Sequence, residues 1–272
     1  MELVGASAFF ELSSFALGLM LFGIVLGATA LGLLLGRRLR HLSESLREPF
    51  AVLQAALLGV VGLLLAFGLA LAVDRYESRR GALVTETNAI GTTYLRAQTL
   101  AEPGRSRSLA LIARYTDATI RLSKAVPGSN AAVDAVADGE RLQRALWALA
   151  GKQLDNAPVA SAPRLYVETL NEMFDAQTAR VSTLNNRVPS AVLFLEVAGA
   201  ALALGLLAAY LAILGRALAA VLLAAILVSM LLLVTCDLDR PTRGLIRVPD
   251  TPLVDLRAGM HAPPAAAAPR NP

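Results

Sequence analysis

Apolar residues gather into four long runs along the chain. The runs cover residues 12–36, 50–73, 191–214 and 217–236. Each run is long enough to cross the roughly 30 Å hydrocarbon core of a bilayer as a helix that rises about 1.5 Å per residue. The pattern therefore predicts four transmembrane helices.

The flanks of these runs pair them into two hairpins. Pro49 is a helix-start residue, and it opens the second run shortly after the first has ended. Only Gly215 and Arg216 separate the third run from the fourth, so these two helices must be antiparallel neighbours. We expect one transmembrane hairpin within residues 1–73 and another within residues 190–236. Because Met1 and Glu2 offer no basic segment, the first run is expected to be a retained helix and not a cleaved signal.

Residues 74–189, between the hairpins, are polar enough to leave the membrane. Three breakers divide them into four segments: Pro103-Gly104, Pro127-Gly128 and the stretch 158–163. Apolar residues in these segments recur at three- and four-residue steps, as in amphipathic helices, and no strand-like alternation competes. We predict an all-α membrane protein in which a four-helix bundle domain lies between the two hairpins.

The remaining residues, 237–272, are rich in proline. Pro241, Pro249 and Pro252 leave no room for a long helix. The Ala- and Pro-rich stretch from His261 to Pro272 has a composition typical of disorder. We expect a C-terminal tail whose last part is disordered.

Composition supports a membrane protein and excludes several functions. The chain is 56% hydrophobic with a mean hydropathy of +0.57, well above the soluble average. Its net charge of +4 comes from dispersed arginines, which excludes a nucleic-acid partner. Cys236 is the single cysteine, so no intramolecular disulfide can form. His41 and His261 lie outside any metal-binding or catalytic motif, and we expect no enzyme activity, catalytic residue, metal or cofactor.

Arginines near the apolar runs bear on orientation. The loop of the first hairpin carries Arg37, Arg38, Arg40 and Arg47, which favours hairpin loops on the cytoplasmic side. The tail carries five arginines and the two hairpin loops carry five in total, so only the usual dominance of the first helix decides the matter. The five tail arginines are Arg240, Arg243, Arg247, Arg257 and Arg270.

The second run presents a face of small residues. Gly59, Gly62, Ala66 and Ala70 follow one another at three- and four-residue steps. Such a face allows another helix to pack closely, or it leaves room for an ion in a pore, with Phe67 as a hydrophobic constriction. The pattern does not separate these two interpretations.

Charges at the ends of the runs offer two further candidates. Arg75 and Arg79 stand four residues apart after the second run, where they could attract an anion or anchor the helix at the interface. Glu196 is the only charge within the apolar runs. Comparison with the length of the fourth run places it level with the interface, where it could pair with Arg187 or Arg75.

The first and last helices of the bundle domain are unusually polar. Glu86, Asn88, Thr92, Thr93 and Arg96 belong to the first helix. Asn171, Glu172, Asp175 and Arg180 belong to the last. We expect these groups to pair with one another inside the bundle.

Four motifs resemble those of a known family. They are Glu86–Arg96, Leu170–Asp175, Asn186–Pro189 and Asp237–Val248. In this order they are similar to motifs of the bacterial bestrophin-like membrane proteins, long classed as a domain of unknown function, and the resemblance runs from about Leu19 to Leu256. Its polar motif residues are Glu86, Asn88, Arg96, Asn171, Glu172, Asp175, Arg187, Asp239 and Arg240.

The resemblance implies a function through a more distant family. The family is related to bestrophins, which are pentameric anion channels whose second helix lines the pore and continues into a cytosolic helical bundle. The Arg75–Arg79 segment is similar to the Arg-Trp-Trp-Glu-Ala-Arg stretch that follows the bestrophin pore helix, although Tyr76 and Glu77 replace its two tryptophans. Past its first residue, Phe50, the second run holds Phe67 as its single phenylalanine, where bestrophins have a ring of phenylalanines.

From the resemblance we expect a homo-oligomeric channel for inorganic anions such as chloride, in a bacterial inner membrane. A cytosolic bundle, as in bestrophins, conflicts with the orientation that the first-loop arginines favour. The alternative function is a non-conducting membrane protein whose bundle binds a ligand or partner, as a sensor or scaffold.

Overall fold

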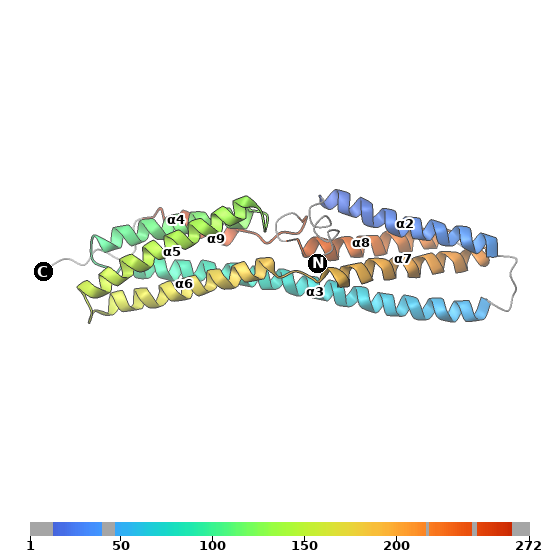
Figure 1. Ribbon diagram of the computed structural model, residues 1–272, viewed down its shortest axis with the longest axis horizontal. Coiled ribbons are helices and arrows are strands. Elements are labelled where there is room, and N and C mark those ends of the chain that lie inside the picture. Colours follow the sequence, from blue (N-terminus) through green and yellow to red (C-terminus); the bar gives the residue numbers. More distant parts are fainter. Residues whose placement is uncertain (1–12, 40–46, 216–217, 241–243, 263–272) are drawn as a thin grey trace. The chain divides into compact units, whose positions relative to one another are not determined.

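The computed structural model describes residues 13–39, 47–215, 218–240 and 244–262, and in this part of the chain every regular element is a helix (Figure 1). With the labels of Figure 1, the helices are α2 (Ser14–Leu39), α3 (Arg47–Ala97), α4 (Gly104–Lys124), α5 (Asn130–Asn156), α6 (Ser161–Asn185), α7 (Ser190–Ile213), α8 (Leu218–Leu238) and α9 (Thr251–Gly259).

Contacts divide the chain into two compact units. The membrane unit holds the described residues up to Tyr76 together with Arg187–Arg247. The bundle unit holds Glu77–Asn186 together with the described residues from Val248 onward. Four helices are long and apolar enough to cross a bilayer, and the predicted runs lie in them as α2, α3, α7 and α8. The predicted all-α fold of two transmembrane hairpins flanking a helical bundle is therefore confirmed. Arg40, His41, Arg216, Arg243 and the predicted disorder of 263–272 lie outside the described residues.

Helices α2 and α7 approach each other closely in the membrane unit. A Cβ added at Gly32 would overlap the backbone carbonyl of Gly205, and one added at Gly36 would overlap that of Ala209. Without a hydrophobic driving force in lipid, such close backbone approach is what holds apolar helices together. The tightest small-residue packing thus lies in the first and third runs, whereas the sequence had drawn attention to the second.

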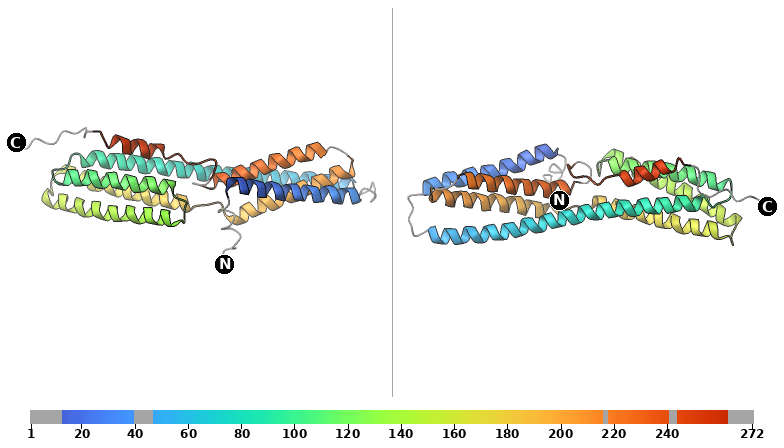
Figure 2. Two further views of the ribbon diagram at one scale, coloured as in Figure 1. Left: turned by 90° about the horizontal axis from the view of Figure 1, so that it is seen from above. Right: turned by 180° about the vertical axis from the view of Figure 1, so that it is seen from behind.

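The second transmembrane hairpin turns at a glycine. Gly215, two residues after the end of α7, has φ +71°, a conformation that favours glycine over residues with a side chain. Helix α8 then packs against α2 and α7 (Figure 2). The core of the membrane unit is aliphatic, with Leu17, Leu21, Val25, Leu204 and Leu232 almost fully buried.

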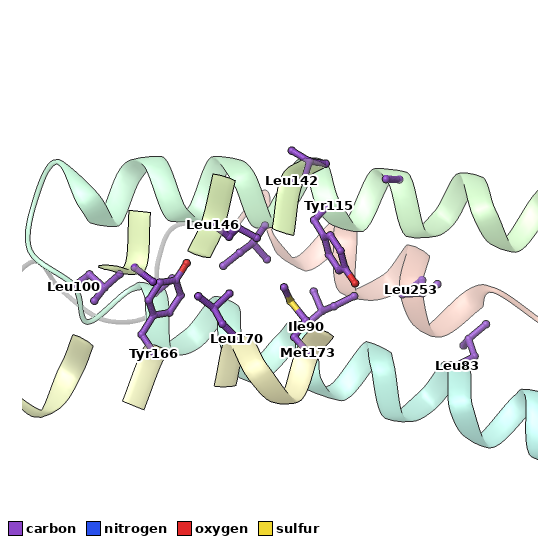
Figure 3. Packing of buried hydrophobic residues seen from close by; sticks show 14 residues of the cluster. Leu83, Ile90, Leu100, Tyr115, Leu142, Leu146, Tyr166, Leu170, Met173 and Leu253 are labelled. Carbon is purple, nitrogen blue, oxygen red and sulfur yellow. The ribbon is translucent and has the colours of Figure 1, made fainter. Parts of the chain in front are cut away.

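The bundle unit has a core built from all four of its long helices. Figure 3 shows Tyr115 and Tyr166 among aliphatic side chains between the helices. Every large side chain in this core is at most 1% exposed except Leu83 and Leu142. The fully buried members are Ile90, Leu100, Ile112, Tyr115, Leu146, Tyr166, Leu170, Met173 and Leu253.

One ion pair lies inside this core. Arg180 Nη1 of α6 donates to Glu86 Oε2 of α3 over 2.6 Å, and the two side chains are 3% and 0% exposed. The Tyr115 hydroxyl of α4 donates to the other carboxylate oxygen of Glu86 over 3.2 Å. Burial, followed by the Glu86 charge, raises the pKa of Tyr115 well above its usual value, so this hydroxyl remains a donor. Three helices are thus joined through one carboxylate.

The chain after α8 returns to the bundle unit, which the sequence did not predict. There α9 buries Leu253 completely, Arg257 Nε donates to Asp117 Oδ1 of α4 over 2.8 Å, and the Tyr94 hydroxyl donates to the Met260 carbonyl over 3.1 Å. Pro252 stands in the first turn of α9, where proline is tolerated. This part of the predicted tail is an ordered element of the bundle unit.

Gly32→Ala should destabilise the membrane unit, because the added methyl group overlaps the Gly205 backbone and forces α2 and α7 apart. We expect the free energy of unfolding to fall by about 1–3 kcal/mol, measured by thermal unfolding of the detergent-solubilised protein with circular dichroism. Gly23→Ala is the matched control, since no atom lies within 4 Å of its added Cβ. Equal stability of the two variants would contradict the close packing of α2 on α7.

Arg180→Met should destabilise the bundle unit by about 3–5 kcal/mol, because it leaves the Glu86 carboxylate buried without its counter-charge. Unfolding in urea can be followed by the fluorescence of Trp147, the single tryptophan, which lies in α5. The double variant Glu86→Leu with Arg180→Met should recover most of the loss.

The control for this experiment is Arg141→Met, which removes an exposed ion pair with Asp138. Its effect should stay below about 1 kcal/mol, as for other surface pairs. A loss of similar size in both arginine variants would show that burial of the Glu86–Arg180 pair has no special weight.

Candidate functional site

Helix α3 presents its small residues on a face that no described residue of the chain covers. Gly59 and Gly62 have no atom within 4 Å of an added Cβ, and Ala66 and Ala70 are exposed. Phe67, on the same side, is 59% exposed. Within the described part of one chain, therefore, this face makes no tight helix contact. A helix that packs closely on it would have to come from outside the described residues.

The opposite face of α3 packs against α7. A Cβ added at Gly199 of α7 would lie 3.3 Å from a methyl carbon of Val61. Leu65 and Ala72 are buried on the same side. One side of the helix thus serves the fold of the chain, and the side that carries Gly59 and Phe67 does not.

Arg75 and Arg79 have different environments. Arg75 is half-buried, and no described side chain forms an ion pair or hydrogen bond with it. Arg79 is only 2% exposed, and its guanidinium donates to the carbonyls of Thr183 over 3.4 Å and Asn186 over 3.0 Å. These carbonyls belong to the end of α6, where backbone acceptors lack helical partners. The expected pair of anion-attracting arginines is therefore wrong for Arg79, which caps a helix.

Glu196 is buried within the membrane unit. It is 2% exposed, and its carboxylate fills the space beside Gly68 of α3, where any added Cβ would overlap it. Among the described residues neither carboxylate oxygen has a hydrogen-bond partner, so the possible pairing with Arg187 or Arg75 does not occur. Position 68 requires glycine because the Glu196 carboxylate occupies the space that a side chain there would need.

The polar motif at the end of α8 holds two loops of the membrane unit. Asp237 accepts hydrogen bonds from the Ser14 hydroxyl over 2.9 Å and from the Ile246 amide over 2.8 Å. Asp239 accepts one from the Val188 amide over 3.1 Å. The carboxylates of Asp237 and Asp239 and the Arg240 side chain are at most 3% exposed, and Arg187 is half-buried. Buried carboxylates that accept backbone amides act here as connectors of the fold.

The polar residues of the bundle separate into two groups. Glu86 and Arg180 pair in the core, and the Thr93 hydroxyl donates to the Thr169 carbonyl over 2.9 Å. The other predicted residues are exposed, and their side chains pair with no described residue, so their expected pairing inside the bundle is wrong. These exposed residues are Asn88, Thr92, Arg96, Asn171, Glu172 and Asp175.

The described residues contain no group of three or more His, Cys, Asp or Glu side chains placed to hold a metal ion. Three surfaces remain without a partner among the described residues. They are the exposed α3 face around Phe67, the Arg75 side chain beyond it, and the unpaired exposed charged residues of the bundle. These are surfaces for an ion path or for another protein chain, and the sequence found the first of them through its three- and four-residue spacing.

Comparison with solved structures identifies the fold. A bacterial bestrophin homologue from Klebsiella pneumoniae has a TM-score of 0.63 and 13% sequence identity over 87% of this chain and 97% of its own. A single-residue variant of a Klebsiella pneumoniae homologue has a TM-score of 0.64 and 14% identity with the same coverage. At this identity the likeness concerns the fold.

No functionally curated protein matches the sequence. The bestrophin-like domain, in contrast, matches residues 19–253, which run from within α2 to the start of α9. The resemblance carried by the four motifs is thereby confirmed, and this integral membrane protein belongs to the bestrophin-like family.

Proposed function

We propose that this bestrophin-like protein is a homo-oligomeric channel for inorganic anions in a bacterial inner membrane, with α3 lining the path. The observation that carries the proposal is the uncovered small-residue face of α3. One chain supplies one wall of a path, so conduction requires several copies arranged around an axis with these faces inward.

The chemistry of this face supports conduction. Gly59, Gly62, Ala66 and Ala70 have little side-chain volume, which leaves room for an ion between facing helices. Phe67 is the aromatic side chain on this exposed side of α3, next to the exposed Leu63, and a ring of phenylalanines would make a hydrophobic constriction. Arg75 lies two turns further along α3 and is free to attract anions to the end of the path.

Reconstitution of the purified protein into chloride-loaded vesicles tests the proposal. Phe67→Ala should raise anion flux, because it removes the constriction. Arg75→Ala should lower flux on the order of fivefold, the effect of about 1 kcal/mol of lost attraction.

Two controls match these variants. Phe194→Ala removes a phenylalanine that is 75% exposed on α7, and Arg80→Ala removes an exposed arginine that pairs with Glu77. Both should leave flux and selectivity unchanged. The channel proposal is overturned if the oligomeric protein gives no anion flux, or if the Phe67 and Arg75 variants leave the flux unchanged. The alternative of a non-conducting sensor or scaffold would then stand.

The orientation of the bundle can be tested separately. The first-loop arginines predict cytoplasmic hairpin loops and hence a bundle on the outer side of the membrane, and we propose this orientation. Val159, between α5 and α6, is 89% exposed. With Cys236→Ala as background, Val159→Cys should react in intact cells with a maleimide that does not cross the inner membrane. Reaction only after permeabilisation would place the bundle in the cytoplasm, as the relation to bestrophins implies.

A further inference from the structure

A hollow, positively charged groove runs between α4 and α5 on the surface of the bundle unit. Two cavities of about 410 and 340 Å³ lie in it and share Leu111 and Ala145 as lining residues. The groove is hollow because its floor consists of small and aliphatic side chains. Its cations are Arg107, Arg114, Arg121, Arg141 and Lys152.

Three of these cations have no counter-charge within the described residues. Arg121 and Arg141 both pair with Asp138, and Asp117 of the same groove pairs with Arg257 of α9. Arg107, Arg114 and Lys152 take part in no side-chain hydrogen bond or ion pair in the described part of the chain. The groove therefore presents an unbalanced positive charge over an apolar floor.

The exposed face of α6 carries the complementary charge. Glu168, Glu172 and Asp175 follow at steps of four and three, so they lie along one face of the helix. All three are exposed, and no described side chain pairs with them. Glu172 and Asp175 are two of the residues that were expected to pair inside the bundle.

The basic groove and the acidic face lie at the same height along the bundle. Helices α4 and α6 both run antiparallel to α5, which lies between them in sequence (Figure 1). An added Cβ at Gly139 of α5 would have Gln177 Nε2 of α6 at 2.8 Å and Tyr115 Cε2 of α4 at 3.9 Å, so Tyr115 and Gln177 mark one level.

From this level the charges match in register. Arg114 stands one residue before Tyr115, and Asp175 stands two residues before Gln177. Arg107 and Glu168 each stand seven residues further back in their helices, which is about 10 Å at the helical rise. Arg114 and Arg107 therefore each have an acidic counterpart at the same height to within one or two residues.

The two surfaces also lie on different sides of the bundle. Helix α4 contacts α3 through Tyr115 and Glu86, and α6 contacts α3 through Arg180 and Glu86, so α4 and α6 flank α3. A rotation about an axis parallel to the bundle keeps heights unchanged and brings one flank of each copy against the opposite flank of the next. Contacts between two different surfaces of identical chains close into rings in this way.

We infer that the basic α4–α5 groove of one subunit receives the acidic α6 face of its neighbour. The inference rests on the proposed homo-oligomer, and it names the surface by which the bundle units assemble. Arg114 faces Asp175 of the neighbouring subunit, and Arg107 faces Glu168, while the apolar floor gives these charge pairs a partly dehydrated setting. Complementary charges of this kind set partner choice and register.

Cross-linking of the full-length protein tests the docking. In a Cys236→Ala background, Arg114→Cys and Asp175→Cys are produced as separate chains and together in one chain. A short bismaleimide should give a covalent dimer when the two single variants are co-expressed, and a ladder of higher species from the double variant. Each single variant alone should stay uncrosslinked.

A control pair and a charge exchange sharpen the result. Arg114→Cys with Asp134→Cys uses another exposed acidic position, at the start of α5, and should give no ladder. With cysteines at Arg107 and Glu168 as reporters, Arg114→Asp should lower the cross-linking yield at least fivefold, and addition of Asp175→Arg should restore it.

Oligomer mass measured in detergent separates the two proposals. A monomer overturns the proposed oligomeric channel itself. An oligomer that gives no 114–175 cross-link, or that cross-links the control pair equally well, overturns the docking of α6 in the groove and leaves the channel standing.

Discussion

Helix α3 satisfies its own backbone hydrogen bonds through 51 residues, and both units of the chain are built on it. In lipid no water is available to the backbone, so an apolar segment must remain helical throughout. The same helix then continues as a core element of the bundle unit, where Leu83, Ile90 and Ala97 recur every seven residues and are buried.

What changes along α3 is the set of groups that cover it. Its first half packs only one stripe against α7, and most of its remaining surface is apolar and exposed. In the second half α4 and α6 both reach Glu86. Removal of a charge pair from water costs more than its attraction returns unless every donor and acceptor is used, and Arg180 with Tyr115 meets this condition for the carboxylate. The pair thus favours one register of three helices over others.

The motifs shared with the bestrophin-like family serve this architecture more than an ion path. Asp237 and Asp239 tie backbone amides to the end of α8, and Glu86 joins the bundle helices. Such roles demand particular side chains at particular places, which is why the motifs identify the fold. The α3 face that we propose to conduct ions needs only small volume, a requirement that many residues meet and that leaves no distinctive motif.

The surface of the bundle shows the same contrast between residues that serve the fold and residues that remain open to a partner. The open residues lie in the groove between α4 and α5 and on the acidic face of α6. Polar residues that cannot be buried without partners remain on the surface, and there they are available to another copy of the chain. The bundle core needs Glu86 and Arg180 inside, whereas Glu172 and Asp175 belong to the surface of α6.

The sequence by itself determined the four membrane helices and the limits of the bundle helices, because run length, period and proline position act locally along the chain. It also placed the small residues of the second run on one face. Only the tertiary structure decided that α2 and α7 make the tightest contact, since glycine stripes look alike until a partner is present. Arg79 reaches carbonyls more than a hundred residues away, Glu196 fills the room left by Gly68, and the nine-residue α9 is too short to be stable without the packing of Leu253. These outcomes depend on contacts between distant segments, which no local pattern specifies.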